Sequence, residues 1–330
     1  MKTDGTLLLT RREVAELLTV DECIAAVEQA FTLYGVGAVP KPGLLSVHCQ
    51  DGAFHIKAGL LTLAKPYFVA KTNGNFFQNS KRFGLPNIQG IILLCDAQNG
   101  HPLALMDSIE ITIRRTGAAT AVAAKYLSRQ DSSVATICGC GNQGRISLRA
   151  ISRVRPIKRV FAYDTDEAQA RQFAEELSNE LQIEIEPTAE LASAVEQSQI
   201  CVTCTPSREH FLSREYVMPG TFIAAVGADS EEKQELDPRL LASHKVVADI
   251  LDQCATIGEL HHAIEKGLMT RTDVHAELGE VVAGRKIGRE SADEMIIFDS
   301  TGMALQDAAA AVLVYEKAVS AGRGSETKFA

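Results

Sequence analysis

The residues most clearly arranged for chemistry are three glycines after an apolar run. Gly139, Gly141 and Gly144 have the spacing GxGxxG. They follow the apolar run 134–138 and precede a helical pattern over 142–153. In this context the first glycine permits a tight turn, the second lets the backbone approach a pyrophosphate, and the third lets helix and strand pack closely. The helix N-terminus adds free N–H groups and a positive dipole end. The stretch predicts a dinucleotide-binding turn.

An acidic residue at the end of the next predicted strand bears on the choice of dinucleotide. Asp164 follows the run 158–163 and stands 20 residues after Gly144. A carboxylate there can accept hydrogen bonds from both ribose hydroxyls and would repel a 2′-phosphate, which favours NAD and leaves NADP as the second choice. Asp164 also suits the N-cap of a helix starting near Asp166, as do Thr165 and Asp166 themselves. The two roles are compatible.

Polar residues also follow two later predicted strands, in the segments 203–207 and 225–229. Because the carboxyl ends of parallel strands line the crevice where ligands bind, both segments are expected near a nicotinamide. Asp229, with Lys233 and Glu235 behind it, could transfer the proton that accompanies hydride transfer. Asp229 equally suits the N-terminus of a helix, and the residues alone leave both roles open.

Cations stand in otherwise apolar segments of the N-terminal third. They are Lys57, Lys71, Arg114 and Arg115. A single Lys or Arg in such a run usually snorkels or lies at an edge. Several of them facing a dinucleotide site suggest carboxylate recognition, because Arg can bind a carboxylate through two hydrogen bonds. A desolvated Lys can also have a lowered pKa and act as an acid or base.

The N-terminal third, which must position these cations, changes from a helical to an extended pattern. Residues 11–34 predict a helix. Short apolar runs then predict an antiparallel, sheet-rich region at 44–47, 54–58, 67–73, 89–95 and 102–107. Turns are predicted at Asp51-Gly52, Asn73-Gly74 and Asn99-Gly100. A helix over 109–127 is rich in small residues, which allows close packing against a neighbour.

The rest of the chain alternates between strands and helices, which implies parallel pairing with right-handed crossovers. The predicted strands are 133–138, 158–163, 183–186, 199–204, 221–226, 245–248 and 295–298. The predicted fold class is α/β: a Rossmann-type doubly wound sheet plus a separate α+β, sheet-rich domain. We place the sheet-rich domain at 1–112, joined by a C-terminal helix within 304–330, and the Rossmann domain at 113–303. The tail 322–328 is expected to be frayed.

Composition excludes several classes of protein. The chain has 330 residues, 46% of them hydrophobic, and a formal net charge of −9. This charge argues against a nucleic-acid partner, which needs a basic surface. No apolar run reaches the roughly 20 residues of a membrane span, and the N-terminus lacks the core of a signal peptide. We therefore expect a cytoplasmic protein without a membrane partner.

Most of the eight cysteines stand in apolar runs, where a free Cys behaves as a small hydrophobe. Cys201 and Cys204 have the spacing of a redox or metal site. However, no second CxxC or His pair at zinc spacing accompanies them, and they fall on a predicted core strand. No metal site is predicted.

Six ordered motifs relate the sequence to a known family. They are Lys71-Thr-Asn73, Gly84-Leu-Pro86-x-x-x-Gly90, Thr112-x-x-Arg115-Thr116-Gly-Ala118-Ala119, Gly139-x-Gly141-x-Gln143-Gly144, Gly227-Ala-Asp229-x-x-x-Lys233-x-Glu235-Leu236 and Asp299-Ser-Thr-Gly302. Over nearly its whole length the chain resembles the ornithine cyclodeaminase and mu-crystallin family, which includes alanine dehydrogenase and ketimine and pyrroline-2-carboxylate reductases. The resemblance implies a homodimer built through the sheet domain, NAD(P) in the Rossmann domain, and an amino or imino acid between the domains.

The resemblance also implies roles for single residues. Lys71 and Arg115 would hold the substrate carboxylate, and Lys41 and Lys57 would be further substrate-binding residues. Asp229 would be the acid/base residue, with Lys71 as a second candidate for proton transfer. The residues implied at the dinucleotide are Thr116, Gly139, Gly141, Asn142, Gln143, Gly144, Asp164, Thr205 and Val226.

The chain departs from the family pattern in four places. Lys41 stands where the family often has Arg, and Lys57-Ala58 stands where Met-Pro is common. His55 aligns with the Glu that would meet the distal amine of a cyclodeaminase substrate, and Glu231-Glu232 replaces a common Pro-Gly. Loss of that Glu removes a charge that selects a distal ammonium, and Lys57 would repel one, so ornithine is disfavoured as the substrate.

These features together predict an NAD(P)H-dependent oxidoreductase acting on a small 2-amino acid or the related cyclic imine carboxylate. The same residues would serve a cyclodeaminase that releases ammonia from ornithine or lysine. A third alternative is a binding protein similar to mu-crystallin that holds NAD(P)H and a ligand without turnover.

Overall fold

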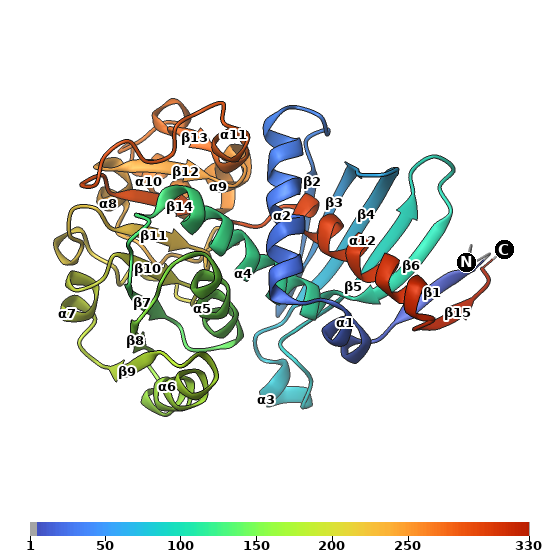
Figure 1. Cartoon of the computed structure of the whole chain (residues 1–330), viewed down its shortest axis with the longest axis horizontal. Coiled ribbons are helices and arrows are strands. Elements are labelled where there is room, and N and C mark those ends of the chain that lie inside the picture. Colours follow the sequence, from blue (N-terminus) through green and yellow to red (C-terminus); the bar gives the residue numbers. More distant parts are fainter. Residues whose placement is uncertain (1–4, 330) are drawn as a thin grey trace. The chain divides into compact units, whose positions relative to one another are not determined.

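The computed structural model describes residues 5–329, and the chain divides into two compact units. Unit 1 comprises Met1–Arg115 with Met303–Ala330, and unit 2 comprises Thr116–Gly302. The described strands form two sheets, one in each unit (Figure 1). The boundary between the units falls within one helix, α4 (Ser108–Leu127).

Unit 1 is a seven-stranded sheet in the order β15-β1-β6-β5-β4-β3-β2. Its strands are β1 (Thr6–Leu9), β2 (Gly43–Cys49), β3 (Gly52–Thr62), β4 (Pro66–Asn75), β5 (Ile88–Asp96), β6 (Pro102–Asp107) and β15 (Ser325–Thr327). Its helices are α1 (Arg11–Leu17), α2 (Val20–Gly35), α3 (Asn79–Phe83) and α12 (Ala304–Ala321). Helix α12 lies along one face of the sheet, against β3 and β4, and α2 packs on α12 (Figure 1).

Alternation along β4 decides which side chains α12 covers. Tyr67, Val69, Lys71 and Asn73 are buried, whereas the residues between them are less buried. Successive side chains of a strand point to opposite faces, so Lys71 shares the helix-covered face with apolar neighbours. The small residues of α12 let the helix approach closely, and a Cβ at Gly59 of β3 would lie 3.3 Å from the Cβ of Ala304.

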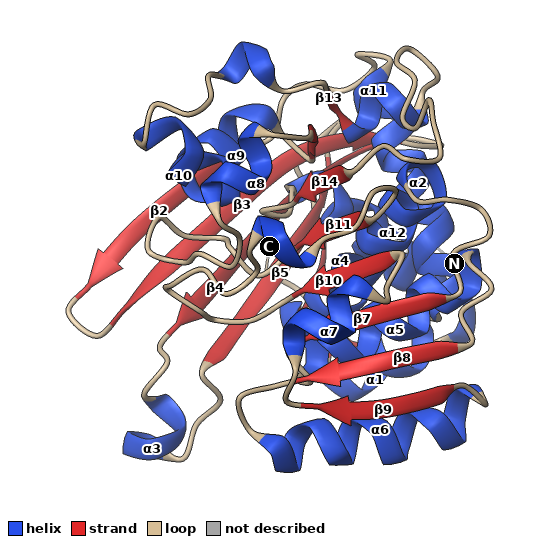
Figure 2. Ribbon diagram, turned by 90° about the vertical axis from the view of Figure 1, so that its left-hand side faces the viewer, coloured by secondary structure: helices blue, strands red, loops and turns tan. Residues whose placement is uncertain are grey.

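Unit 2 is an eight-stranded, all-parallel sheet in the order β13-β12-β14-β11-β10-β7-β8-β9 (Figure 2). Its strands are β7 (Val134–Cys138), β8 (Arg159–Tyr163), β9 (Glu184–Thr188), β10 (Ile200–Thr203), β11 (Phe222–Ala225), β12 (Lys245–Ala248), β13 (Ala276–Glu277) and β14 (Ile296–Asp299). Its helices include α5 (Asn142–Val154), α6 (Glu167–Leu181), α7 (Leu191–Glu196), α8 (Pro238–Ala242), α9 (Leu251–Ile257), α10 (Glu259–Glu265) and α11 (Leu278–Val282). The strand order reverses between β7 and β10, which is where such sheets bind ligands.

The small residues of α4 serve the close packing that their size predicts. A Cβ at Gly117 would lie 2.8 Å from Cγ1 of Ile146 and 2.9 Å from its carbonyl oxygen. Helix α5 therefore approaches the backbone of α4 too closely for a larger residue at this position.

Three local predictions are wrong, each for an identifiable reason. Residues 11–34 form two helices, because Thr19 starts α2 with a capping box that also involves Glu22. Asn73-Gly74 lies inside β4, where pairing with both β3 and β5 overrides its turn preference. The tail is not frayed, since Ser325–Thr327 pairs antiparallel with β1. In addition, β1 pairs in parallel with β6, so the sheet is not purely antiparallel.

The predicted fold class is confirmed: a doubly wound parallel sheet accompanies a separate α+β, sheet-rich unit. Among the described residues, no helix is both long enough and apolar enough to cross a membrane.

Candidate active site

The glycine turn of unit 2 contains two glycines that the fold requires and one that it does not. Gly139 has φ +103°, and a Cβ there would lie 3.0 Å from the carbonyl oxygen of Cys204. A Cβ at Gly144 would lie 2.0 Å from the carbonyl oxygen of Gly139. By contrast, a Cβ at Gly141 would meet nothing within 4 Å. The space beside Gly141 is therefore open for the close approach of a ligand.

The N-terminus of α5 directly follows this open position. Gly141 is the N-cap, and within the described structure no side chain caps the helix. Asn142 at the first helical position is exposed. The Oε1 atom of Gln143 is buried without a hydrogen-bond partner among the described residues. These groups fit a dinucleotide pyrophosphate, because the N-terminal N–H groups and the helix dipole favour an anion.

Asp164 follows β8 and holds the glycine turn. Its carboxylate accepts hydrogen bonds from the N–H of Cys140 at 2.8 Å and of Asp166 at 3.0 Å. The N-cap of α6 is Asp166, which accepts from the N–H of Ala168 at 2.9 Å. The capping alternative for Asp164 is therefore wrong, and its carboxylate lies beside the glycine turn.

Glu235 joins the loops that follow β10 and β11. Its carboxylate accepts from the hydroxyl of Thr203 at 2.7 Å, from the N–H and hydroxyl of Thr205 at 2.6 and 2.8 Å, and from the N–H of Gly227 at 3.0 Å. Val226 is held by a bond from its N–H to the carbonyl of Thr203, at 2.9 Å. Both predicted dinucleotide-contacting loops are thus fixed by one buried side chain.

Two further carboxylates extend this arrangement. Glu259 accepts from the N–H groups of Glu235 and Leu236, and Asp299 accepts from those of Glu259 and Leu260. We call Glu235, Glu259 and Asp299 the carboxylate network. Burial raises the pKa of all three, to about 7 for Asp299.

Asp229 lies in the loop after β11 and does not begin a helix, so the capping alternative is wrong here also. Its carboxylate pairs with the ammonium of Lys233 at 2.6 Å. The side chain of Asp229 is 41% exposed, whereas that of Lys233 is 13% exposed. Asp229 is therefore accessible to solvent at the carboxyl end of a central strand.

The predicted cations Lys57, Lys71 and Arg115 gather in unit 1. Lys57 and Lys71 are directly paired across β3 and β4. The ammonium of Lys71 lies 2.8 Å from Oδ2 and 2.9 Å from Oδ1 of Asp307, and Nε of Arg115 donates to Oδ1 at 3.1 Å. All four residues are less than 9% exposed. We call Lys57, Lys71, Arg115 and Asp307 the cation cluster.

The cation cluster contains three cationic side chains and one carboxylate. Burial lowers the pKa of Lys71 to about 7, with the charge of Asp307 opposing this shift and the charges of Arg115 and Lys57 adding to it. Burial tends to raise the pKa of Asp307, but Lys71 and Arg115 hold it below its usual value. Such a buried cluster favours binding of a further anion.

Lys41, Arg114 and Thr116 have surroundings of a different kind. Lys41 is exposed in the segment before β2, whereas the residues of the cation cluster are buried. Arg114 donates to the backbone carbonyls of Ala15 and Leu18, so it anchors α1. Thr116 is buried at the start of unit 2, and its carbonyl accepts from Thr120.

A family model described as "Ornithine cyclodeaminase/mu-crystallin family" matches residues 5–322. The chain belongs to the ornithine cyclodeaminase/mu-crystallin family. It is 41% identical to an alanine dehydrogenase from Archaeoglobus fulgidus over 326 residues, which cover 98% of each chain. A solved archaeal alanine dehydrogenase dimer with bound NAD superposes with a TM-score of 0.94 at 41% identity, covering 99% of this chain and 100% of the other.

A second solved member of the family is the Δ1-pyrroline-2-carboxylate reductase of Thermococcus litoralis in complex with NADH and L-proline. It superposes with a TM-score of 0.92 at 36% identity, covering 98% of this chain and 100% of that chain.

Sequence reasoning missed Asp307 and its neighbour Gln306 in this family member. Gln306 is fully buried and accepts from Nη1 of Arg115 at 2.9 Å, which fixes its amide orientation. Both residues are polar within the otherwise apolar, alanine-rich segment 303–314. That break in the pattern was the available signal.

The Cys201–Cys204 spacing reflects packing. Cys201 is buried in β10, and Cys204 donates from its thiol to the carbonyls of Cys138 and Gly139. Burial raises the pKa of Cys204 well above its ordinary value, which opposes formation of a reactive thiolate.

Proposed function

We propose that the protein is an NAD-dependent oxidoreductase acting on a small 2-amino acid or the related cyclic imine carboxylate. The observation that carries the proposal is the grouping of the buried cations Lys71 and Arg115 on Asp307 in unit 1, with Lys57 directly across from Lys71. A small carboxylate is an anion of suitable charge for this cluster. The similarity to an alanine dehydrogenase and to a pyrroline-2-carboxylate reductase supports this substrate class.

Unit 2 would hold the dinucleotide. Gly139, Gly141, Gly144, Asn142 and Gln143 would meet the pyrophosphate, Asp164 the adenosine ribose, and Thr116, Thr205 and Val226 the nicotinamide half. The cofactor, when bound, supplies the hydride chemistry. The carboxylate of Asp164 favours NAD over NADP, because it would repel a 2′-phosphate.

Lys71 and Arg115 would bind the substrate carboxylate. Arg115 is held by Asp307 and Gln306 in one orientation, so binding costs little further ordering of its side chain. Lys57 adds charge to the same cluster, and Lys41 is a further candidate on the surface of unit 1. Lys57 also disfavours substrates with a distal ammonium.

Asp229 would transfer the proton near the reacting carbon and nitrogen of the substrate. Lys71 is the second candidate for this role. The ammonium of Lys233 pairs with the carboxylate of Asp229 and holds it in place. Asp229→Ala should lower kcat strongly while the affinity for NADH, followed by fluorescence titration, stays unchanged. Near-normal turnover of this variant would show that the role assigned to Asp229 is wrong.

A substrate screen tests the proposed activity. Net NADH oxidation with pyrroline-2-carboxylate, piperideine-2-carboxylate or pyruvate plus ammonia is the expected result. Ammonia release from ornithine or lysine without net NADH change would instead indicate a cyclodeaminase. Tight NADH binding with neither reaction would indicate a binding protein, and would contradict the proposed activity.

We also propose a homodimer formed through the open face of the unit 1 sheet. Leu45, Val47, Phe54, Leu60 and Ile91 are exposed by 38–58%. The pairing register places Val47 opposite Phe54, on the face away from Lys57 and Lys71. An apolar sheet face of this kind is typical of an interaction surface.

Substitution of this face tests the dimer. Leu45→Glu combined with Val47→Glu should give a monomer by light scattering, whereas Ile287→Glu, at an exposed apolar position of unit 2, should not. A dimer unchanged by the double substitution would exclude this face.

A cytoplasmic location is proposed as well, supported by the eight free cysteines, which suit a reducing compartment.

A further inference from the structure

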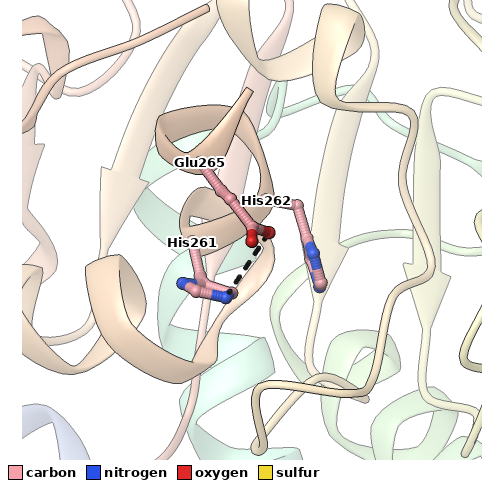
Figure 3. Close-up of side chains that lie close together, drawn as sticks. All are labelled: His261, His262 and Glu265. Carbon is pink, nitrogen blue, oxygen red and sulfur yellow. Dashed lines mark ion pairs between the residues drawn. The ribbon is translucent and has the colours of Figure 1, made fainter. Parts of the chain in front are cut away.

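Helix α10 carries a group of metal-ligating side chains outside the sites described above. His261, His262 and Glu265 each offer one ligand atom, and these atoms lie within 4.8 Å of one another. Figure 3 shows the carboxylate of Glu265 extending toward the two imidazole rings. His261 and Glu265 are one helical turn apart, and Nε2 of His261 lies 4.0 Å from Oε2 of Glu265.

One ring of the group has a backbone partner that decides which of its nitrogens can bind a metal ion. Nε2 of His262 lies 2.8 Å from the carbonyl oxygen of Lys233. A carbonyl accepts, so this nitrogen carries the hydrogen and Nδ1 keeps its lone pair. A backbone carbonyl bonded to the second ring nitrogen is the usual support of a metal-binding histidine.

We propose that His261, His262 and Glu265 form a binding site for a divalent transition-metal ion of the Zn²⁺ class. Two imidazole nitrogens and one carboxylate oxygen suit Zn²⁺, whereas Mg²⁺ and Ca²⁺ favour sets of oxygen ligands. Ligands about 2 Å from a tetrahedral ion lie closer together than 4.8 Å, so the side chains must contract around it. The partly exposed rings and the exposed carboxylate of Glu265 leave room for this rotation.

The site lies on the helix that holds the Asp229 loop. His262 contacts the backbone of Lys233, and Glu259 on the same helix accepts from the N–H groups of Glu235 and Leu236. Lys233 in turn pairs with Asp229. Metal binding therefore stabilises the 229–236 segment.

The test uses the untagged full chain with Cys49→Ser, which removes the exposed thiol as a competing ligand. Calorimetric titration with Zn²⁺ should give one equivalent per chain, and Mg²⁺ should give none at this site. His261→Ala and Glu265→Gln should each weaken Zn²⁺ binding by at least about tenfold. His210→Ala, an exposed histidine of the same unit, should leave it unchanged. Equal Zn²⁺ affinity in all three variants, or no saturable binding, would overturn the site.

Hydrogen exchange provides the second readout, independent of turnover. Zn²⁺ should slow amide exchange in peptides covering 229–236 in the parent protein but not in His261→Ala. Stoichiometric binding without slower exchange would overturn the link to the loop. Circular dichroism of each variant separates loss of the site from loss of the fold.

Discussion

The two units each bury charged side chains, and they satisfy those charges in different ways. In unit 1, the cation cluster places one carboxylate, Asp307, against Lys71 and Arg115, with Lys57 adding further positive charge. In unit 2, the members of the carboxylate network accept hydrogen bonds from backbone N–H groups of the loops they join. One cluster gathers cations around a carboxylate, and the other binds its carboxylates to the backbone of the fold.

This difference separates a binding role from a scaffolding role. Buried charges are costly unless they are paired or hydrogen-bonded. The N–H groups around the carboxylate network are parts of the fold, so that network needs no ligand. The cation cluster should gain stability when an anion enters. We therefore expect loss of a cation from the cation cluster to affect ligand binding first, and changes in the carboxylate network to affect folding first.

Lys71→Met should produce the largest effect on activity. Loss of one cation from the carboxylate site should lower kcat/KM about 10³-fold, or about 4 kcal/mol. The free energy of unfolding should change by less than about 1 kcal/mol, because Arg115 still neutralises Asp307 and a desolvated ammonium is removed. Steady-state kinetics and urea unfolding measure the two quantities. Lys65→Met, at a partly exposed lysine paired with Asp96, is the control. A large loss of stability in Lys71→Met would contradict the comparison.

Asp307→Asn should destabilise unit 1 by about 3 kcal/mol, because it leaves buried cations without their counter-charge. Adding Lys71→Met to this variant should recover part of the loss, since one unpaired cation is then removed. Urea unfolding of both single variants and the double variant gives the coupling energy. Asp131→Asn, at a 71% exposed side chain, should change stability little. If the changes in the free energy of unfolding were strictly additive, Lys71 and Asp307 would not interact as described.

Glu235→Gln should cost about 2 kcal/mol of stability in unit 2. The amide has one acceptor oxygen, so a partly buried N–H of Thr205 or Gly227 loses its partner. The midpoint of thermal unfolding should fall, and Glu184→Gln at an exposed position should leave it unchanged. If the midpoint stayed the same while NADH binding disappeared, the carboxylate network would be part of the binding site. It would then have no separate scaffolding role.

Asp164→Asn tests a carboxylate of unit 2 that lies outside the network and keeps some exposure. The amide oxygen can still accept from the N–H of Cys140, but the charge that repels a 2′-phosphate is lost. The ratio of kcat/KM for NADH over NADPH should fall about tenfold, or about 1.4 kcal/mol. Asp166→Asn keeps a good N-cap and should not alter this ratio. An unchanged ratio in Asp164→Asn would remove the basis for preferring NAD.

The smallest expected effect is the pH dependence of anion binding. The pKa of Lys71, lowered by burial to about 7, means that the ammonium is present below this pH and lost above it. Affinity for pyrrole-2-carboxylate, a planar analogue that cannot be reduced, should therefore fall about fivefold from pH 7 to pH 8. Lys71→Met should bind more weakly and show no such dependence. An affinity that rises over this pH range would show that the ammonium form of Lys71 does not favour anion binding.

Local patterns were sufficient for the architecture. Alternating apolar strands and helices predicted the parallel sheet, because each element must bury one face. The glycine spacing predicted the turn before α5, where backbone strain at Gly139 and close packing at Gly144 depend only on nearby atoms. The local errors arose where pairing with a distant strand overrode the turn preference of Asn73-Gly74 or ordered the tail.

The sequence by itself therefore determined the fold class, the glycine turn and the candidate substrate-binding cations. Only the tertiary structure decided their partners. Asp307 meets Lys71 from 236 residues away, and Glu235 meets Thr205 from 30 residues away. Whether a buried charge is paired depends on every group that surrounds it after folding. Spacing along the chain does not identify those distant neighbours.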